Sequence, residues 1–350
     1  MTAADLWARL SASDVVSGER PEPVPSGSPW FVRLMLGIAG WIGALFLLGF
    51  VGTALEFILE DGPSAIIAGA VCCAAAFAIF QRMDGKDAAE QFALALSLAG
   101  QGLLIVGLAD IFDADDPTLY FAIAAVELAL VWMIPNFVHR FLAAAGSALA
   151  ITLAINQLGL HGLATPLLCV ALALIWLDAT KWATAGSLWR PIGYGLVLAV
   201  ITIETFHVLR GEDVFGIARA DGWMALHGQW IGRGVTGVVL LLASASLAVR
   251  EGYRPGSRIF LLSVCAAGLS AILGVVAPGL GSTLLILLLG YAAGNRLLVG
   301  AGIFGLLGFT SHYYYSLHAS LLSKSAILAL TGFVLLAIAW YLRRDGVRHA

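Results

Sequence analysis

Glu127 is an acidic residue in the middle of a long apolar run, where it could bind a proton or an ion. The run, YFAIAAVELALVWMIP, contains no other charged side chain. An ionised carboxylate in the hydrocarbon core of a membrane costs about 3 kcal/mol or more, so such residues tend to face the interior of a helix bundle. Two interpretations stay open: a proton or ion site, or a protonated or hydrogen-bonded carboxyl that only serves packing.

A second acidic residue, Glu204, is followed three residues later by His207, and this spacing places both on one face of a helix. A Glu-x-x-His pair can bind a metal ion, but such a site needs further ligands from other helices. We predict instead a polar pair that borders an external cavity. A structural pair at the membrane interface is the alternative.

Lys324 lies in SLHASLLSKSAILAL, four residues after Ser320 and on the same helical face. Its long stem would let the ammonium group reach the membrane surface. Alternatively, Lys324 is the counter-ion of one of the two buried glutamates. The sequence thus predicts a substrate or ion pathway that contains Glu127, Glu204, His207 and Lys324.

Several histidines are expected near the external membrane face, together with an aspartate-rich loop. His312 and His318 belong to this group, and Asp110 begins the loop. A metal-dependent hydrolase can be built from such residues. However, the two histidines are six residues apart, which does not place them on one helical face, and the chain has no HExxH motif. We predict an external polar cluster of His312, His318 and Asp110, with no metal and no catalytic residue.

The elements that must position these residues are membrane-spanning helices. Of the 350 residues, 60% are hydrophobic and 12% are charged, which is too little polar surface to cover a soluble globule. Apolar runs long enough to cross a ~30 Å hydrocarbon core recur along the chain, and inside lipid their backbone groups are satisfied by helices. The sequence therefore predicts an all-α, polytopic helical membrane protein. A net charge of −3 gives no indication of nucleic-acid binding.

Hydropathy divides the chain into about 12 predicted transmembrane helices within a membrane domain at 31–342. Residues 1–30 are predicted to be a cytoplasmic tail with a short amphipathic turn and a Pro-rich linker, and 343–350 a second cytoplasmic tail. One external loop is expected at 210–233, and its apolar residues predict a short helix that lies in the membrane interface. The predicted helices are 32–58, 63–80, 91–109, 117–134, 141–158, 162–178, 189–209, 234–249, 259–277, 281–294, 297–310 and 319–342. The tenth and eleventh of these are short enough to form one re-entrant hairpin instead.

The basic residues fix an orientation for this topology. Most of the 19 Lys and Arg residues fall in segments that are cytoplasmic if the N-terminus is inside. The exceptions are Arg210, Arg219 and Arg233 in the long external loop, and Lys324 near a helix end. Because basic residues are retained on the cytoplasmic side, an N-in/C-in protein of the bacterial inner membrane is expected.

Small residues predict how the helices pack. Gly302, Gly305 and Gly308 recur at helical spacing in the eleventh predicted helix and favour close approach of a neighbour. The four cysteines all lie in predicted helices and form no CxxC pair, so they are expected to be small packing residues.

Two stretches resemble a known family. WFVRLMLGIAGWIGALFLLGFVG at 30–52 and YYYSLHASLLSKSAILALTGFVLLAIAWYLRR at 313–344 are similar to the bacterial multi-spanning membrane family called domain of unknown function 4401. The resemblance implies the same helical fold over nearly the whole chain, and it brings no activity, ligand or catalytic residue. Relatives often accompany a small membrane-anchored protein with a Gly-Asp-Tyr motif, which implies a membrane-protein partner.

Three function classes remain open. A transporter-like protein with an intramembrane carboxylate site is favoured by the many helices and by Glu127. A non-catalytic membrane subunit or scaffold of a multi-protein complex is the alternative, favoured by the lack of catalytic motifs. A membrane enzyme that acts on lipid or glycan at the external face is expected least. No cofactor is predicted, and without a P-loop the chain is not expected to hydrolyse ATP.

Overall fold

A computed structural model gives the fold of this chain. It describes residues 3–13, 61–82, 87–210 and 222–316, with single positions elsewhere, and the secondary structure of this part is helical. A short amphipathic helix, α1 (Ala3–Ala12), lies within the predicted N-terminal tail. The first and last predicted spans, 32–58 and 319–342, lie outside the described residues.

Ten predicted spans fall within the described residues, and a helix forms at each of them. A helix that crosses a membrane needs about 20 consecutive apolar residues, so the apolar runs of the sequence predict where these helices lie. The helices are α3 (Gly62–Arg82), α4 (Asp87–Ile111), α5 (Pro117–Met133), α6 (Phe137–Gln157), α7 (Ala164–Trp176), α8 (Ala179–Arg210), α9 (Trp223–Arg250), α10 (Arg258–Val276), α11 (Leu280–Ala292) and α12 (Arg296–Ser316).

The helices fall into two groups by length. Within the described part of the chain, 7 helices are long and apolar enough to cross a membrane, and α5, α7 and α11 are shorter apolar helices. Helices α7 and α11 have 13 residues each. At 1.5 Å per residue such a helix is about 20 Å long, which is less than the ~30 Å hydrocarbon core.

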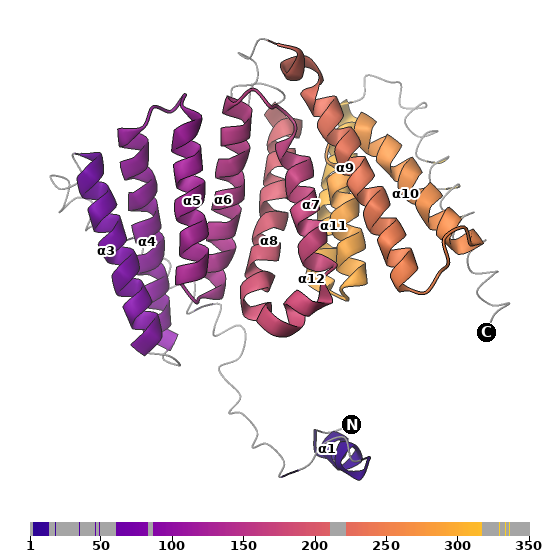
Figure 1. The fold of residues 1–350 in the computed structure, drawn as a ribbon, viewed down its shortest axis with the longest axis horizontal. Helices are drawn as coiled ribbons and strands as arrows, with labels where there is room; N and C mark the ends of the chain where they lie inside the picture. Colours follow the sequence, from indigo (N-terminus) through magenta and orange to yellow (C-terminus); the bar gives the residue numbers. More distant parts are fainter. Residues whose placement is uncertain are drawn as a thin grey trace.

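The helices stand side by side in an antiparallel array (Figure 1). Helices α3, α4, α5 and α6 follow one another across one half, and α7 to α12 form the other half, in which α8 stands next to α6. The largest buried apolar cluster joins α7, α8, α9, α11 and α12, with Leu172, Ile203 and Leu285 fully buried in it. The second half therefore holds the core of the bundle.

Two helices, α8 and α9, begin about ten residues earlier than the hydropathy predicted. Helix α8 begins at Ala179 and is kinked at Ala185, where the backbone leaves the helical region. Helix α9 begins at Trp223, so the second part of the external loop expected at 210–233 belongs to a helix. Arg233 consequently lies within α9 and not in a loop.

Glycines let neighbouring helices approach closely. A Cβ on Gly100 of α4 would lie 2.7 Å from the backbone oxygen of Gly69 on α3, and the reverse contact has the same length. On α12, a Cβ on Gly302 would lie 2.8 Å from the backbone of α11, and one on Gly305 would lie 2.6 Å from Thr283. Gly308 has no neighbour within 4 Å, so the predicted packing role holds for the first two glycines of this group.

Candidate functional site

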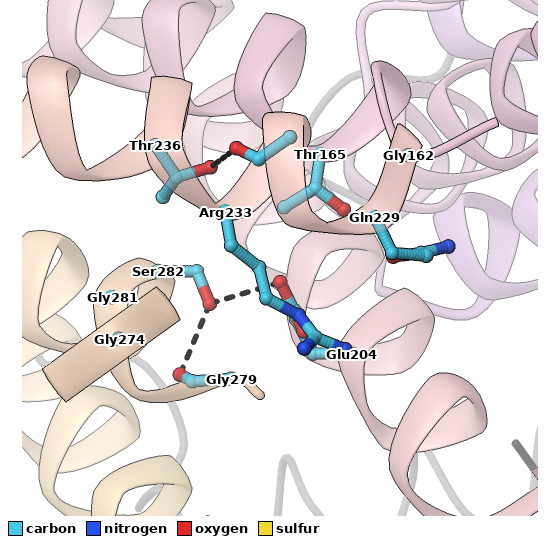
Figure 2. A pocket seen from close by; sticks show the side chains of 11 residues that line it. Gly162, Thr165, Glu204, Gln229, Arg233, Thr236, Gly274, Gly279, Gly281 and Ser282 are labelled. Carbon is cyan, nitrogen blue, oxygen red and sulfur yellow. Dashed lines mark hydrogen bonds between the residues drawn. The ribbon is translucent and has the colours of Figure 1, made fainter. Parts of the chain in front are cut away.

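The polar residues inside the second half of the bundle gather around Glu204 of α8. The side chain of Glu204 is 7% exposed. It borders a small pocket between α7, α8, α9 and α11 that we call the Glu204 pocket (Figure 2). Its lining residues are Gly162, Thr165, Glu204, Gln229, Gly232, Arg233, Thr236, Gly274, Gly279, Gly281 and Ser282.

The Glu204 carboxylate has partners from two other helices. The hydroxyl of Ser282, in the first turn of α11, donates to its Oε1 over 3.4 Å. The same Ser282 hydroxyl also lies 3.1 Å from the carbonyl of Gly279, the residue before α11. Arg233 of α9 extends its guanidinium towards Glu204, and the two charges attract each other (Figure 2). The pocket thus contains a buried carboxyl group and a half-buried guanidinium of opposite charge.

Two short helices begin at the pocket. Helix α7 starts at Ala164 and α11 at Leu280, and neither has a side-chain hydrogen bond at its N-cap. The unpaired N–H groups and the dipole at a helix N-terminus favour negative charge. The two N-termini and Arg233 therefore make this pocket electrostatically suited to a carboxylate or another small anion.

Glycines of α9 hold the α6–α7 loop against the pocket. A Cβ on Gly228 would lie 2.0 Å from the carbonyl oxygen of His161, and one on Gly232 would lie 2.0 Å from that of Gly162. One helical turn beyond Glu204, His207 lies within 3.3 Å of the side-chain amide of Gln229. Glu204 thus lines the pocket itself, whereas His207 contacts it through Gln229.

A second group of buried polar residues lies in the first half of the bundle. We call it the Glu127 cluster, and its members come from four helices. Glu127 of α5 is 0% exposed. Its two carboxylate oxygens each lie 2.7 Å from Nε2 of Gln101 on α4. The members are Cys73, Ser97, Gln101, Glu127 and His139.

The Glu127 cluster continues towards the end of the bundle where α5 joins α6. Ser97, one turn before Gln101 on α4, lies 2.9 Å from Nδ1 of His139 in the first turn of α6. The ring of His139 is 0% exposed, and its Nε2 has no partner. Arg140 follows at this end, where it donates from Nε to the carbonyl of Val131 over 3.0 Å.

The residues of the predicted pathway therefore fall into two places. Glu127 and Glu204 are both buried, but they belong to clusters lined by different helices, so the structure does not join them in one site. The predicted counter-ion Lys324 lies outside the described residues. For Glu204, the basic group that the structure supplies is Arg233.

The structure describes two of the three residues of the predicted external polar cluster, Asp110 and His312, and it does not bring these two together. Asp110 is exposed at the end of α4, and its Oδ2 accepts a hydrogen bond from Gly62 of α3 over 2.8 Å, so it caps a neighbouring helix. His312 is exposed on α12, which is not adjacent to α4 (Figure 1). His318 lies outside the described residues. Across the described residues, no three His, Cys, Asp or Glu side chains group as metal ligands.

Sequence reasoning did not identify most partners of the two glutamates. Gln229 and Arg233 fall within the predicted external loop, although their four-residue spacing would place them on one face of a helix. The same spacing relates Ser97 to Gln101 within an apolar helix, and this was the available signal for the Glu127 cluster. Ser282 gives no such signal, because a lone serine at a helix start is a common cap.

The fold and its polar clusters define the class: an integral membrane protein built of apolar helices, with acidic residues buried among them. The chain belongs to the family described as Domain of unknown function (DUF4401), whose family model matches residues 29–345. The resemblance of the two end segments is thereby confirmed. No curated protein and no solved structure matches the chain.

Proposed function

We propose that this protein transports a small polar solute or ion across the membrane, and that the Glu204 pocket is its binding site. The observation that carries this proposal is the convergence of two short helix N-termini, a carboxylate and a guanidinium in one buried pocket. In many transporters, substrate sites near the middle of the membrane are formed by interrupted helices whose N-termini point at the bound group.

The charges of the pocket support a binding role over a purely structural one. A buried ion pair recovers the cost of desolvation only when its hydrogen bonds are good. Here the Ser282 bond to Glu204 is long, at 3.4 Å. An anionic or zwitterionic solute would offer Arg233 and the helix N-termini a better partner than Glu204 provides.

The proposal is tested by measuring solute binding and uptake with matched variants. Purified protein is screened by thermal unfolding against small carboxylates, amino acids, phosphate and monovalent ions, and the solutes that stabilise it are then tested for uptake in proteoliposomes. We expect Glu204→Gln and Arg233→Gln to abolish both effects. Thr205→Ala is the control, because the Thr205 hydroxyl bonds to its own helix at Ile201. Uptake that persists in both pocket variants would contradict the proposal.

The second candidate function is a membrane subunit or scaffold of a larger complex. One feature favours it: an apolar groove of about 840 Å³ between α9, α10, α11 and α12, which includes the small side chains Ser244, Ser263 and Ala267. Small residues are common where membrane helices associate. Native mass spectrometry of gently extracted protein distinguishes the two, because a subunit leaves the membrane with a second protein at fixed stoichiometry.

We propose further that the chain spans a bacterial inner membrane with about 12 helices, N-in/C-in. Arginines gather at the end of the bundle where α3–α4, α5–α6, α9–α10 and α11–α12 are connected: Arg82, Arg140, Arg250, Arg254, Arg258 and Arg296. The opposite end carries Asp110, Asp113, Asp115 and Asp116. This asymmetry supports a cytoplasmic location for the arginine-rich end.

A further inference from the structure

We propose that Glu127 and Gln101 form a proton-binding site, and that the proton reaches it from the His139 end of the bundle. This goes beyond the solute site, because the Glu127 cluster involves α3, α4, α5 and α6 and shares no residue with the Glu204 pocket. It holds whether or not the Glu204 pocket binds a solute.

The hydrogen bonds of Glu127 suit two protonation states. Nε2 of Gln101 lies 2.7 Å from both carboxylate oxygens, so one N–H donates to the two oxygens together, and both can accept because the ionised carboxylate is acceptor-only. In this arrangement Oε1 of Gln101 is buried without a partner. If Glu127 takes up a proton, a turn of the Gln101 amide lets the new O–H donate to Oε1, while the N–H still donates to the other carboxyl oxygen. In the protonated pair, Oε1 of Gln101 thus accepts the hydrogen bond that it lacks when Glu127 is ionised.

The surroundings of Glu127 favour uptake of that proton. Within the described residues, both hydrogen bonds to the carboxylate come from a neutral amide. A buried charge without a cationic partner is costly, and the cost ends when the carboxyl becomes neutral. Gly146 of α6 faces the carboxyl group, and a Cβ there would already lie 3.3 Å from its Cδ. A glycine at this position leaves space for the carboxyl and amide to rearrange.

Other titratable groups are arranged around the pair. Cys73 of α3 is close enough to interact electrostatically with Glu127. His139 of α6 is bonded to Ser97, one helical turn from Gln101 on α4. Arg140, next to His139, donates to the backbone carbonyls of Val131 and Ser187. The charged groups of this region thus lie at the end of the bundle where α5 joins α6.

These groups give the proton a direction of approach. The unpartnered Nε2 of His139 can accept a proton from water at this end, and its Nδ1 faces the Ser97 hydroxyl at 2.9 Å. A buried polar atom without a protein partner is commonly satisfied by an internal water. On the way, His139 gains a proton at Nε2 and gives one up at Nδ1, and the Ser97 hydroxyl, which otherwise donates to the carbonyl of Leu94 over 2.8 Å, takes up that proton and passes its own on through an internal water. Overall the carboxylate gains one proton and each relay group keeps its number of protons, and release reverses these steps.

Infrared difference spectroscopy against pH tests the site in protein reconstituted in nanodiscs. We expect a protonated carboxyl C=O band that disappears at high pH and is absent in Glu127→Gln. Gln101→Leu should move the band to higher wavenumber, because the carbonyl loses its donor. Ser147→Ala is the control. The Ser147 hydroxyl donates to the carbonyl of Ala124, which lies one helical turn before Glu127 on α5, and removing this hydroxyl should leave the band in place.

Two further variants distinguish this site from the solute pocket and test the route. The band should persist in Glu204→Gln, whatever that variant does to transport. Exchange of the carboxyl proton in D2O should slow several-fold in His139→Phe and Ser97→Ala. A spectrum that is identical in wild type and Glu127→Gln overturns the site, and unchanged exchange in both route variants overturns the route. If Glu127→Gln does not fold, an unshifted band in Gln101→Leu overturns the site instead.

Discussion

The carbonyl oxygen of Gly162 lies so close to α9 that a Cβ on Gly232 would be 2.0 Å from it. The same relation holds one turn earlier, between the carbonyl of His161 and Gly228. The α6–α7 loop therefore rests directly on the backbone of α9. This contact sets where α7 begins, and with it the position of one helix N-terminus in the Glu204 pocket.

A methyl group on this face of α9 should destabilise the protein. We expect Gly232→Ala to lower the free energy of unfolding by at least about 2 kcal/mol, because neither backbone can yield without moving a helix. Gly234→Ala is the matched control, since no atom lies within 4 Å of a Cβ there. Alanine in a helix interior is preferred to glycine by about 0.5–1 kcal/mol, so the control should be unchanged or slightly stabilised. Apparent unfolding temperatures in detergent compare the two, and equal losses would contradict the contact.

Asn295 should contribute more to stability than a simple helix cap. Its Oδ1 accepts hydrogen bonds from the backbone N–H groups of Leu297 and Leu298 at the start of α12, over 3.1 and 3.2 Å. Its Nδ2 also donates to the hydroxyl of Tyr194 on α8, over 2.6 Å. Asn295→Ala removes the cap, which typically contributes about 1 kcal/mol, and it also removes the hydrogen bond to Tyr194 that joins α12 to α8.

Two variants separate these contributions. Asn136 caps α6 through bonds to Val138 and His139, so Asn136→Ala measures the loss of a cap. Tyr194→Phe removes the hydrogen bond to Asn295 and keeps the aromatic ring. We expect Asn295→Ala to lower the unfolding temperature more than either variant does. If Asn295→Ala lowers the unfolding temperature no more than Asn136→Ala does, the hydrogen bond between Asn295 and Tyr194 contributes nothing to stability.

The buried His161 should make the protein sensitive to mild acid. Its side chain is 3% exposed in the α6–α7 loop, and this burial lowers the pKa of the imidazole below its ordinary value. The unfolded chain therefore binds this proton more readily than the folded one, so stability is present above a pH of about 6.5 and is lost as the pH falls below it.

His161→Gln isolates this effect, because glutamine stays neutral. The difference in unfolding temperature between wild type and His161→Gln should change between pH 7 and pH 5, to the disadvantage of the wild type. Thr205→Ala removes no titratable group and provides the control, so its difference from the wild type should be the same at both pH values. A constant difference between wild type and His161→Gln would mean that His161 is not titrated on unfolding.

The helices were predictable from the sequence and most of their polar contacts were not. Run length alone locates α3 to α12, because an apolar segment in lipid has few alternatives to a helix. The start of α9 was missed since Gln229 and Arg233 resemble loop residues, whereas in the bundle they face a polar pocket instead of water. Glu127 is visible as an isolated charge, but its partner Gln101 comes from another helix, and such pairing depends on tertiary packing that one sequence does not reveal.

The orientation of the bundle can be tested with two single cysteines. Asp115 and Arg254 are both exposed in connections at opposite ends of the array, one between α4 and α5 and the other between α9 and α10. With the four native cysteines replaced, a membrane-impermeant maleimide applied to intact cells should label Asp115→Cys and spare Arg254→Cys. Lysed cells are the control, in which both should react. The reverse pattern would place the arginine-rich end outside, and labelling of both in intact cells would contradict a connection on each side of the membrane.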